Sequence, residues 1–300
     1  MEFLNLYWDI IVNAYSGYAG YLWSEITFSY SYKPWWENYF YMLTGVSLFF
    51  FALELLKPWR EGQPKFRKDF WMDAFYMFFN FFLFSLVFYN ALYDVFVNLF
   101  KDFLGDLGMQ NLVAIHIESW SRWVQLLVLF IIRDFIHWNV HRLLHRVSFL
   151  WEFHKVHHSV EQMGFAAHLR YHWMENVVYK GLEYIPLAMI GFGIDDFFIV
   201  HTLGTAIGHW NHANFTLNIG PLKYLFNNPS MHIWHHAYDI PTDRKYGINF
   251  GISLSIWDYM FGTAYIPHNG RDIRLGFPDI ENFPKRFVEQ NLYGFGKGKS

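Results

Sequence analysis

Histidines are concentrated in two short segments of the sequence. Residues 141–159, HRLLHRVSFLWEFHKVHHS, contain five histidines, and residues 231–236, MHIWHH, contain three more. Their spacings of three and four residues place side chains on one face of a helix. The second segment repeats the HxxHH spacing that ends the first, at His154, His157 and His158. Several imidazoles that point in one direction are suited to a metal ion, so the two segments predict a metal centre.

Ten histidines form the predicted ligand set, because each has a neighbour at helical spacing: His141, His145, His154, His157, His158, His209, His212, His232, His235 and His236. Zinc takes four ligands, or three and a water, so this set is too large for one such ion. The set is large enough to bind two six-coordinate ions that each keep positions open for other ligands. Imidazole binds iron, copper, zinc and nickel, so residue type leaves the metal open. His137 and His172 are reserve ligands, while the isolated His116, His201 and His268 are expected to be ordinary polar residues.

Neutral ligands leave the charge of a metal ion uncompensated, and their second ring N–H groups need acceptors. Asp134, Glu161, Glu175 and Asp239 lie beside the histidine segments and are candidates for this role. Each is equally compatible with an ordinary surface carboxylate. The sequence contains no cysteine, which excludes disulfides, thiolate zinc sites and iron–sulfur clusters.

The elements that must position these residues are predicted to be membrane helices. Hydrophobic residues make up 53% of the chain and charged residues only 16%, against about 25% in soluble domains. The apolar runs at 38–56, 70–93 and 123–145 are long enough to span a hydrocarbon core of about 30 Å. The tract at about 176–210, interrupted by GFGIDD, is predicted as a hairpin of full or incomplete depth. With a net charge of −3 and no basic stripe, a nucleic-acid partner is not expected.

We therefore predict an all-α integral membrane bundle of about four transmembrane helices, with a cytosolic helical cap that carries a di-metal site. Residues 1–132 form the N-terminal membrane-embedded region, residues 133–270 the histidine region with the hairpin, and residues 271–300 a polar tail. The loop at 57–69 carries five basic residues, so the positive-inside rule places it in the cytoplasm. Two further crossings return the histidines to that face. The N-terminus lacks the features of a secretory signal and is expected to be retained.

The histidine segments resemble motifs of the fatty acid hydroxylase superfamily, which includes sterol desaturases and alkylglycerol monooxygenase. The resemblance rests on DFIHWNVHRLLH, WEFHKVHHS, HANF, NPSMHIWHH and YGINFGISLSIWDYMFGT, between about residues 133 and 266. It implies a membrane oxygenase with two histidine-bound iron ions at the cytosolic face; zinc can replace iron in overexpressed material. Such an enzyme uses O2 and an external electron donor, a cytochrome or ferredoxin/reductase system, to hydroxylate or desaturate a C–H bond of a membrane lipid. Some members have HxxxH where this chain has His209-Trp-Asn-His212, which leaves open which of the two binds.

Two other functions remain as alternatives. A membrane zinc-dependent hydrolase would use an HExxH segment, in which the glutamate is the general base, and the sequence has none. A divalent-metal transporter would carry its histidines and carboxylates within the spans, whereas the histidine segments follow them. The lipid substrate also stays open, because a sterol, a fatty acyl chain, an ether lipid and a carotenoid all fit a cavity that opens from the bilayer.

Overall fold

The computed structural model describes residues 2–92, 117–192 and 194–295, and the single positions 95, 99 and 106. His116 lies outside the described residues. Within them the chain is helical, with two isolated β-bridges, Phe226–Leu254 and Ala237–Leu275, and no strand. The main helices are α1 (Glu2–Thr27), α2 (Tyr39–Leu56), α3 (Phe70–Phe78), the π-helical segment η2 (Phe79–Tyr89), α5 (Arg122–Arg146), α6 (Ser148–His158), α7 (Trp173–Ile190), α8 (Ile194–His212), α9 (Pro229–His235), α10 (Ile256–Met260) and α11 (Phe287–Leu292).

Among the described residues, three stretches of helix are long and apolar enough to cross a membrane: Tyr39–Leu56, Phe70–Leu92 and Arg122–Arg146. They coincide with the three predicted apolar runs. Only 17% of the α2 window is buried inside the protein, and large side chains such as Leu48, Phe49 and Leu56 are exposed on it. An apolar surface of this size is unfavourable in water and favourable in lipid, which indicates a membrane protein.

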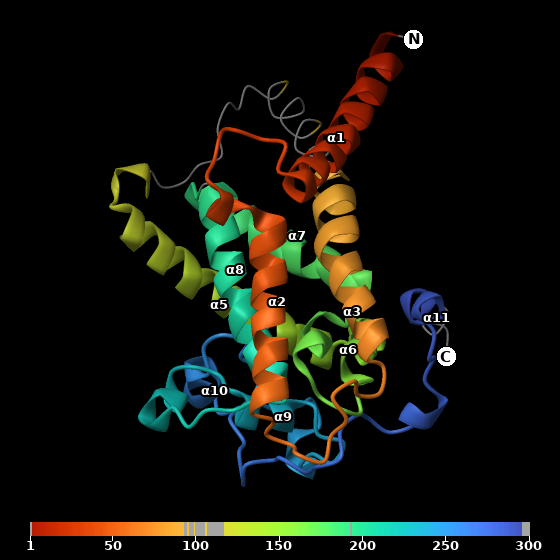
Figure 1. Ribbon diagram of the computed structural model, residues 1–300, viewed down its shortest axis with the longest axis vertical. Helices are drawn as coiled ribbons and strands as arrows, with labels where there is room; N and C mark the ends of the chain where they lie inside the picture. Colours follow the sequence, from red (N-terminus) through yellow and green to blue (C-terminus); the bar gives the residue numbers. More distant parts are fainter. Residues whose placement is uncertain are drawn as a thin grey trace.

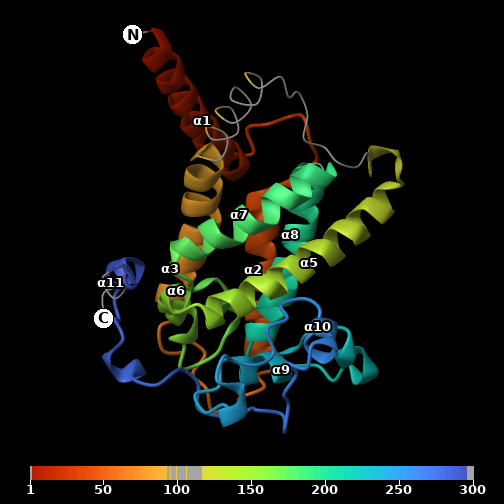
Figure 2. The same cartoon turned by 180° about the vertical axis from the view of Figure 1, so that it is seen from behind.

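The predicted hairpin is formed by α7 and α8, and the helix breaks within the GFGIDD segment, between Ile190 and Ile194. Both helices pack against α5, and α8 also packs against α2. Figure 2 shows α5 running beside α7 and crossing in front of α8. Neither helix is among the three candidate spans, so the number of crossings, predicted at about four, depends on how deeply this hairpin enters the membrane.

A cap of short helices and loops covers the end of the bundle that lies away from the N-terminus (Figure 1). Two buried aspartates, one on α5 and one in the cap, attach the cap to α5. Asp134 on α5 accepts hydrogen bonds from the backbone N–H groups of Ser253 and Leu254, both at 3.1 Å. Asp258 accepts one from Trp138 Nε1 of α5 at 3.0 Å. The closing segment of the histidine region is therefore held directly against the helix that ends in the first histidine pair.

The segment predicted as a polar tail packs on the bundle as far as residue 295. Phe287 of α11 contacts the ring of Tyr76 on α3, with 4.7 Å between the ring centroids. Tyr76 Oη donates to Gln290 Oε1, and Asn291 Nδ2 donates to Tyr76 Oη, both at 3.0 Å. Gln290 and Asn291 of α11 are buried, and Phe287 is half-buried.

Candidate metal centre

Nine of the described histidines come together in two groups at the junction of the bundle and the cap. The first cluster contains His141, His145, His154, His158 and His235, and the second contains His157, His212, His232 and His236. Within each cluster, one ring nitrogen from every histidine lies within 4.8 Å of the others.

Each HxxHH segment supplies both clusters. On α6, His154 and His158 are four residues apart and join the first cluster, while His157 points to the second. On α9 the assignment is reversed, because His232 and His236 join the second cluster and His235 joins the first. The two clusters are therefore adjacent, and α6 and α9 hold them at a fixed separation.

The ring nitrogens have the spacing expected of ligands around an ion. In the first cluster, His141 Nε2 lies 3.1 Å from His154 Nε2. In the second, His212 Nε2 lies 3.0 Å from His232 Nε2 and 3.3 Å from His157 Nε2. Two nitrogens that each lie about 2.1 Å from one ion, at right angles, are about 3.0 Å apart. The residues present thus fit a metal ion in each cluster.

Hydrogen bonds to backbone carbonyls fix which nitrogen faces the cluster in four of the nine rings. Backbone carbonyls can only accept, so the nitrogen that contacts one must carry the proton. Nδ1 donates to a carbonyl in His141 (Phe250 O, 2.7 Å), His157 (Arg170 O, 3.2 Å), His212 (Gly208 O, 2.7 Å) and His235 (Ile248 O, 2.8 Å). The lone pair of each Nε2 is then directed into the cluster. His145 Nε2 is buried there without a hydrogen-bond partner.

Burial also keeps these rings neutral. It lowers the pKa of His157 to about 3 and the pKa of His235 to about 4. At neutral pH both imidazoles therefore carry a free lone pair, as a metal ligand must. Neutral lone pairs that converge without a proton or cation between them repel one another, and a metal ion in each cluster would remove that repulsion.

The region that holds all nine histidines matches a known family. Residues 126–263 match the sequence profile described as fatty acid hydroxylase. These residues belong to the fatty acid hydroxylase family. Enzymes of this family are iron-dependent, and the two clusters are able to bind metal.

Relatives of the fatty acid hydroxylase region have names that refer to lipids. The chain is 31% identical to ornithine lipid hydroxylase OlsE of Rhizobium tropici, over 53% of this chain and 47% of that protein. It is 32% identical to alkylglycerol monooxygenase of Xenopus tropicalis, over 50% of this chain and 31% of that protein. A very-long-chain aldehyde decarbonylase, GL1-10 of Oryza sativa subsp. japonica, is 28% identical over 46% of each chain. The chain thus spans less than half the length of these relatives. No solved structure matches it.

Of the ten predicted ligands, His209 is the one outside the clusters of the fatty acid hydroxylase region. Its Nε2 lies 3.0 Å from Ser47 Oγ on α2, and its Nδ1 lies 3.3 Å from His168 Nδ1. His212, three residues further along α8, is in the second cluster. The sequence left open whether His209 or His212 is a ligand. The structure groups His212 with the other candidate ligands.

The two reserve ligands, His137 and His172, are not in the clusters. His137 Nδ1 lies 2.5 Å from Glu183 Oε1. His172 uses both nitrogens elsewhere: Nδ1 accepts from Met174 N at 3.0 Å, and Nε2 donates to Asn291 O at 2.8 Å. His172 therefore connects the start of α7 to α11.

Of the four candidate carboxylates, Glu175 is the one that the structure places against a cluster histidine. Its Oε2 accepts from His154 Nδ1 at 2.8 Å, in a buried pair. Asp134 instead binds the cap backbone, as described above. Glu161 forms an exposed ion pair with Lys68, and Asp239 is exposed.

His168 was missed by the sequence analysis, although its ring centroid lies 5.1 Å from that of His212. The available signal was its spacing of four residues from His172. That spacing implies a shared face only within a helix, and here the 3₁₀ turn Phe165–Leu169 ends before His172. Gly208 of α8 leaves room for the His168 ring, because a Cβ there would lie 2.2 Å from it.

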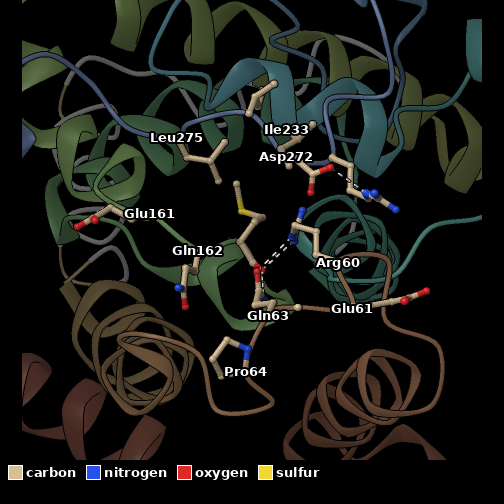
Figure 3. A pocket seen from close by; sticks show the side chains of 13 residues that line it. Arg60, Glu61, Gln63, Pro64, Glu161, Gln162, Ile233, Asp272 and Leu275 are labelled. Atoms are coloured by element: carbon tan, nitrogen blue, oxygen red, sulfur yellow. Dashed lines mark hydrogen bonds and ion pairs between the residues drawn. The ribbon is translucent and has the colours of Figure 1, made fainter.

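Two cavities border this region. The larger, about 410 Å³, lies between the segments 60–64, 161–163 and 271–275, and no cluster histidine lines it. Figure 3 shows Arg60 and Gln63 directed at the backbone oxygen of Met163 in this cavity, with Glu161 at its edge. The smaller, about 120 Å³, is lined by His141, His154, His157 and His168 and extends between α5, α7 and α8. Of these two cavities, the smaller is therefore the one that borders cluster histidines.

Proposed function

We propose that this protein is a membrane oxygenase that hydroxylates or desaturates an unactivated C–H bond of a lipid, with O2 as the oxidant and an external electron donor. The observation that carries the proposal is the pair of buried histidine clusters at the end of an apolar helical bundle. The relatives named for lipid hydroxylation and for a monooxygenase reaction support the same class of reaction.

Each cluster would hold one iron ion, five histidines serving the first and four the second. When bound, the iron ions would supply the activation of O2. The chain contributes fixed, desolvated ligands: the carbonyls of Ile248, Phe250, Arg170 and Gly208 each hold one ring with its Nε2 facing inward. Glu175 accepts the N–H of His154 and holds that ring with its Nε2 facing the first cluster. His168 is a further imidazole beside the second cluster.

We place the clusters on the cytoplasmic face. The basic loop at 57–69 touches the segment that follows α6: Lys68 N donates to Gln162 Oε1 at 2.9 Å, and Arg60 Nη2 donates to Met163 O at 2.9 Å. Loop and clusters therefore share one end of the bundle, and the positive-inside rule assigns that end to the cytoplasm. The α7–α8 hairpin starts and ends at the clusters, at Glu175 and His212, which is consistent with an even number of crossings or a re-entrant hairpin.

The test uses isotopically labelled dioxygen. The full chain, purified in lipid nanodiscs, loaded with iron and supplied with a chemical reductant, is incubated with membrane lipids under labelled O2. Hydroxylation is expected to place the label in a lipid product, and desaturation to give an alkene whose formation requires O2. A lipid product that forms equally without O2 and takes its oxygen from water would instead indicate a hydrolase.

A further inference from the structure

Large apolar side chains are exposed in two segments of the cap. Residues 217–225 contain the 3₁₀ turn η5 (Gly220–Tyr224), and residues 256–261 contain α10. Met260 is the most exposed of these side chains, at 63%. We call the set the cap patch: Leu217, Leu222, Tyr224, Leu225, Met260 and Phe261. An apolar surface that gathers in one place marks a contact with a membrane or with another protein.

The two segments are joined into one surface by hydrogen bonds and ring contacts. Ser255 N donates to Leu225 O at 3.0 Å, and Ser255 Oγ donates to Lys223 O at 2.8 Å. The rings of Tyr224 and Tyr259 lie 5.1 Å apart, measured between centroids. The cap patch is therefore continuous, and its two halves are held in a fixed arrangement.

The cap patch continues the exposed apolar face of α5. The ring of Phe261 lies 6.1 Å from that of Phe135 on α5. Residues four apart are neighbours on a helix surface, and the positions that precede Phe135 at this spacing are exposed: Trp123, Leu127 and Ile131. The face of α5 that is suited to lipid thus runs directly into the cap patch.

The contacts with α5 also give the depth of the cap patch. Trp138, whose ring lies 4.9 Å from that of Phe261, is 16 residues beyond Arg122, where this candidate span begins. That separation is roughly 24 Å along the helix axis, and a hydrocarbon core is about 30 Å thick. Figures 1 and 2 show α5 inclined to α2, which shortens the distance along the membrane normal. The part of the cap that touches Trp138 is therefore level with acyl chains.

The charges around the cap patch fit a lipid surface. Lys223 is the one exposed charge in residues 217–225 and 256–261, because Asp258 is fully buried. Lys223 Nζ lies 5.2 Å from the centroid of the Tyr224 ring, and Arg142 Cζ lies 4.4 Å from the centroid of the Trp138 ring. Long cationic side chains that follow apolar surface can keep their stems among acyl chains while the charge reaches the lipid phosphates.

We infer that the cap patch inserts into the membrane leaflet on the side of the histidine clusters. The apolar side chains lie among the acyl chains, and Lys223 and Arg142 lie at the level of the phosphates. The cap is then anchored to the bilayer by its own surface as well as by the helices that lead to it. This inference requires that α5 crosses the membrane, and it is independent of the reaction that the protein catalyses.

Spin labels can test the depth of the cap patch in the full chain. The sequence contains no cysteine, so one introduced cysteine carries a label at a single known position. Met260→Cys and Leu222→Cys report on the cap patch, and Glu281→Cys, at a charged side chain that is 64% exposed elsewhere in the cap, is the control. The labelled proteins are placed in nanodiscs of phosphatidylcholine and phosphatidylglycerol. Collisions of each label with oxygen, which concentrates among acyl chains, and with a water-soluble nickel complex are then measured.

The ratio of oxygen to nickel collisions is expected to be several-fold higher at both cap-patch positions than at Glu281→Cys. A ratio equal to that of the control would place the cap patch in water and overturn the inference. Low access of both reagents would indicate a contact with a second copy or another protein, and would also overturn it. If one cap-patch variant fails to fold, the other provides the same comparison.

A second arm tests the contact of Lys223 with the lipid phosphates. Lys223→Glu, made together with Met260→Cys, places a carboxylate beside an anionic surface and should move the label towards water, lowering the ratio. The same change in nanodiscs of phosphatidylcholine alone should have a smaller effect, because the surface there carries no net charge. An unchanged ratio in the anionic nanodiscs would overturn the contact between Lys223 and the lipid headgroups.

Discussion

Backbone carbonyls, rather than side chains, orient most of the histidine rings whose Nδ1 partner is known. Ile248 and Phe250 belong to one loop, and their oxygens hold His235 and His141 of the first cluster. Arg170 O holds His157 of the second. Because these acceptors are fixed by the fold, removing one imidazole does not free its neighbours to replace it.

The first prediction concerns His157 and His235, the middle histidines of the two HxxHH segments. His157→Ala and His235→Ala should each abolish turnover and lower bound iron by at least half, while the chain still inserts into the membrane. His268→Ala is the control, since His268 is exposed and outside the clusters, and it should keep iron and most activity. Metal analysis of each purified variant provides the readout. Full iron content and turnover in both alanine variants would show that these rings are not ligands.

Glu175 is expected to raise the affinity of the first cluster for its metal ion. Glu175→Gln removes the carboxylate that accepts the His154 N–H and should weaken iron binding about 10- to 100-fold. Competition with a chelator measures this affinity. Glu161→Gln makes the same chemical change at an exposed ion pair with Lys68 and should have no effect. Equal affinities for the two variants would exclude this role for Glu175.

Protonation of His172 should make the free energy of unfolding depend on pH. Burial lowers its pKa to about 4, from an ordinary value of 6.5. The unfolded chain therefore takes up the proton first, so the stability that neutral His172 provides is complete above pH 6.5. It is lost progressively as the pH falls towards 4, by up to about 3 kcal/mol. Thermal unfolding of the wild-type protein and of His172→Phe, compared over this pH range, should show a shallower dependence in the variant; parallel curves would contradict this.

Within one helix, the spacing of the histidines correctly predicted which of them lie on the same element. It did not predict which histidines of different helices come together. The sequence predicted that His154, His157 and His158 share a helix, and α6 confirms it. It could not show that α6 divides its histidines between two clusters, because that division depends on how α6 packs against α5, α8 and α9. His168 was missed for a related reason, since it lies in a 3₁₀ turn where helical spacing does not apply.

The contact between His168 and α8 gives a prediction at this scale. Gly208→Ala puts a methyl group 2.2 Å from the His168 ring, so the ring must leave its position beside His212. Bound iron and turnover should both fall. Gly181→Ala in α7 is the control, because nothing lies within 4 Å of its Cβ position. Both alanines favour a helix, so a loss confined to Gly208→Ala would report on His168; equal iron content would contradict its placement beside the centre.

For the whole molecule, composition predicted membrane helices, and the three apolar runs coincide with the three candidate spans. The sequence also predicted that the two histidine segments, 141–159 and 231–236, act together, although 71 residues lie between them. The repeated HxxHH spacing suggested that they act together, and the resemblance to a known family supported it. The polar cavity between α5, α7 and α8 was not predicted, because Arg133, Lys180 and Glu183 meet only after the helices pack.

Topology can be checked with tags on the whole chain. A tag in the loop at 57–69 and one at the C-terminus should both report the cytoplasm. A tag in the segment 94–122, most of which lies outside the described residues, should report the opposite side. If this tag and the C-terminal tag report the same compartment, α5 does not cross the membrane.

The central claim is that two adjacent clusters each hold one metal ion, and the iron content of the intact protein tests it most directly. The full chain, purified anaerobically, reconstituted with ferrous iron and freed of loosely bound metal, should retain about two iron atoms per chain, one for each set of four or five imidazoles. Retention of a single ion under the same conditions, with both clusters intact in sequence, would contradict the dinuclear centre and the oxygenase assignment built on it.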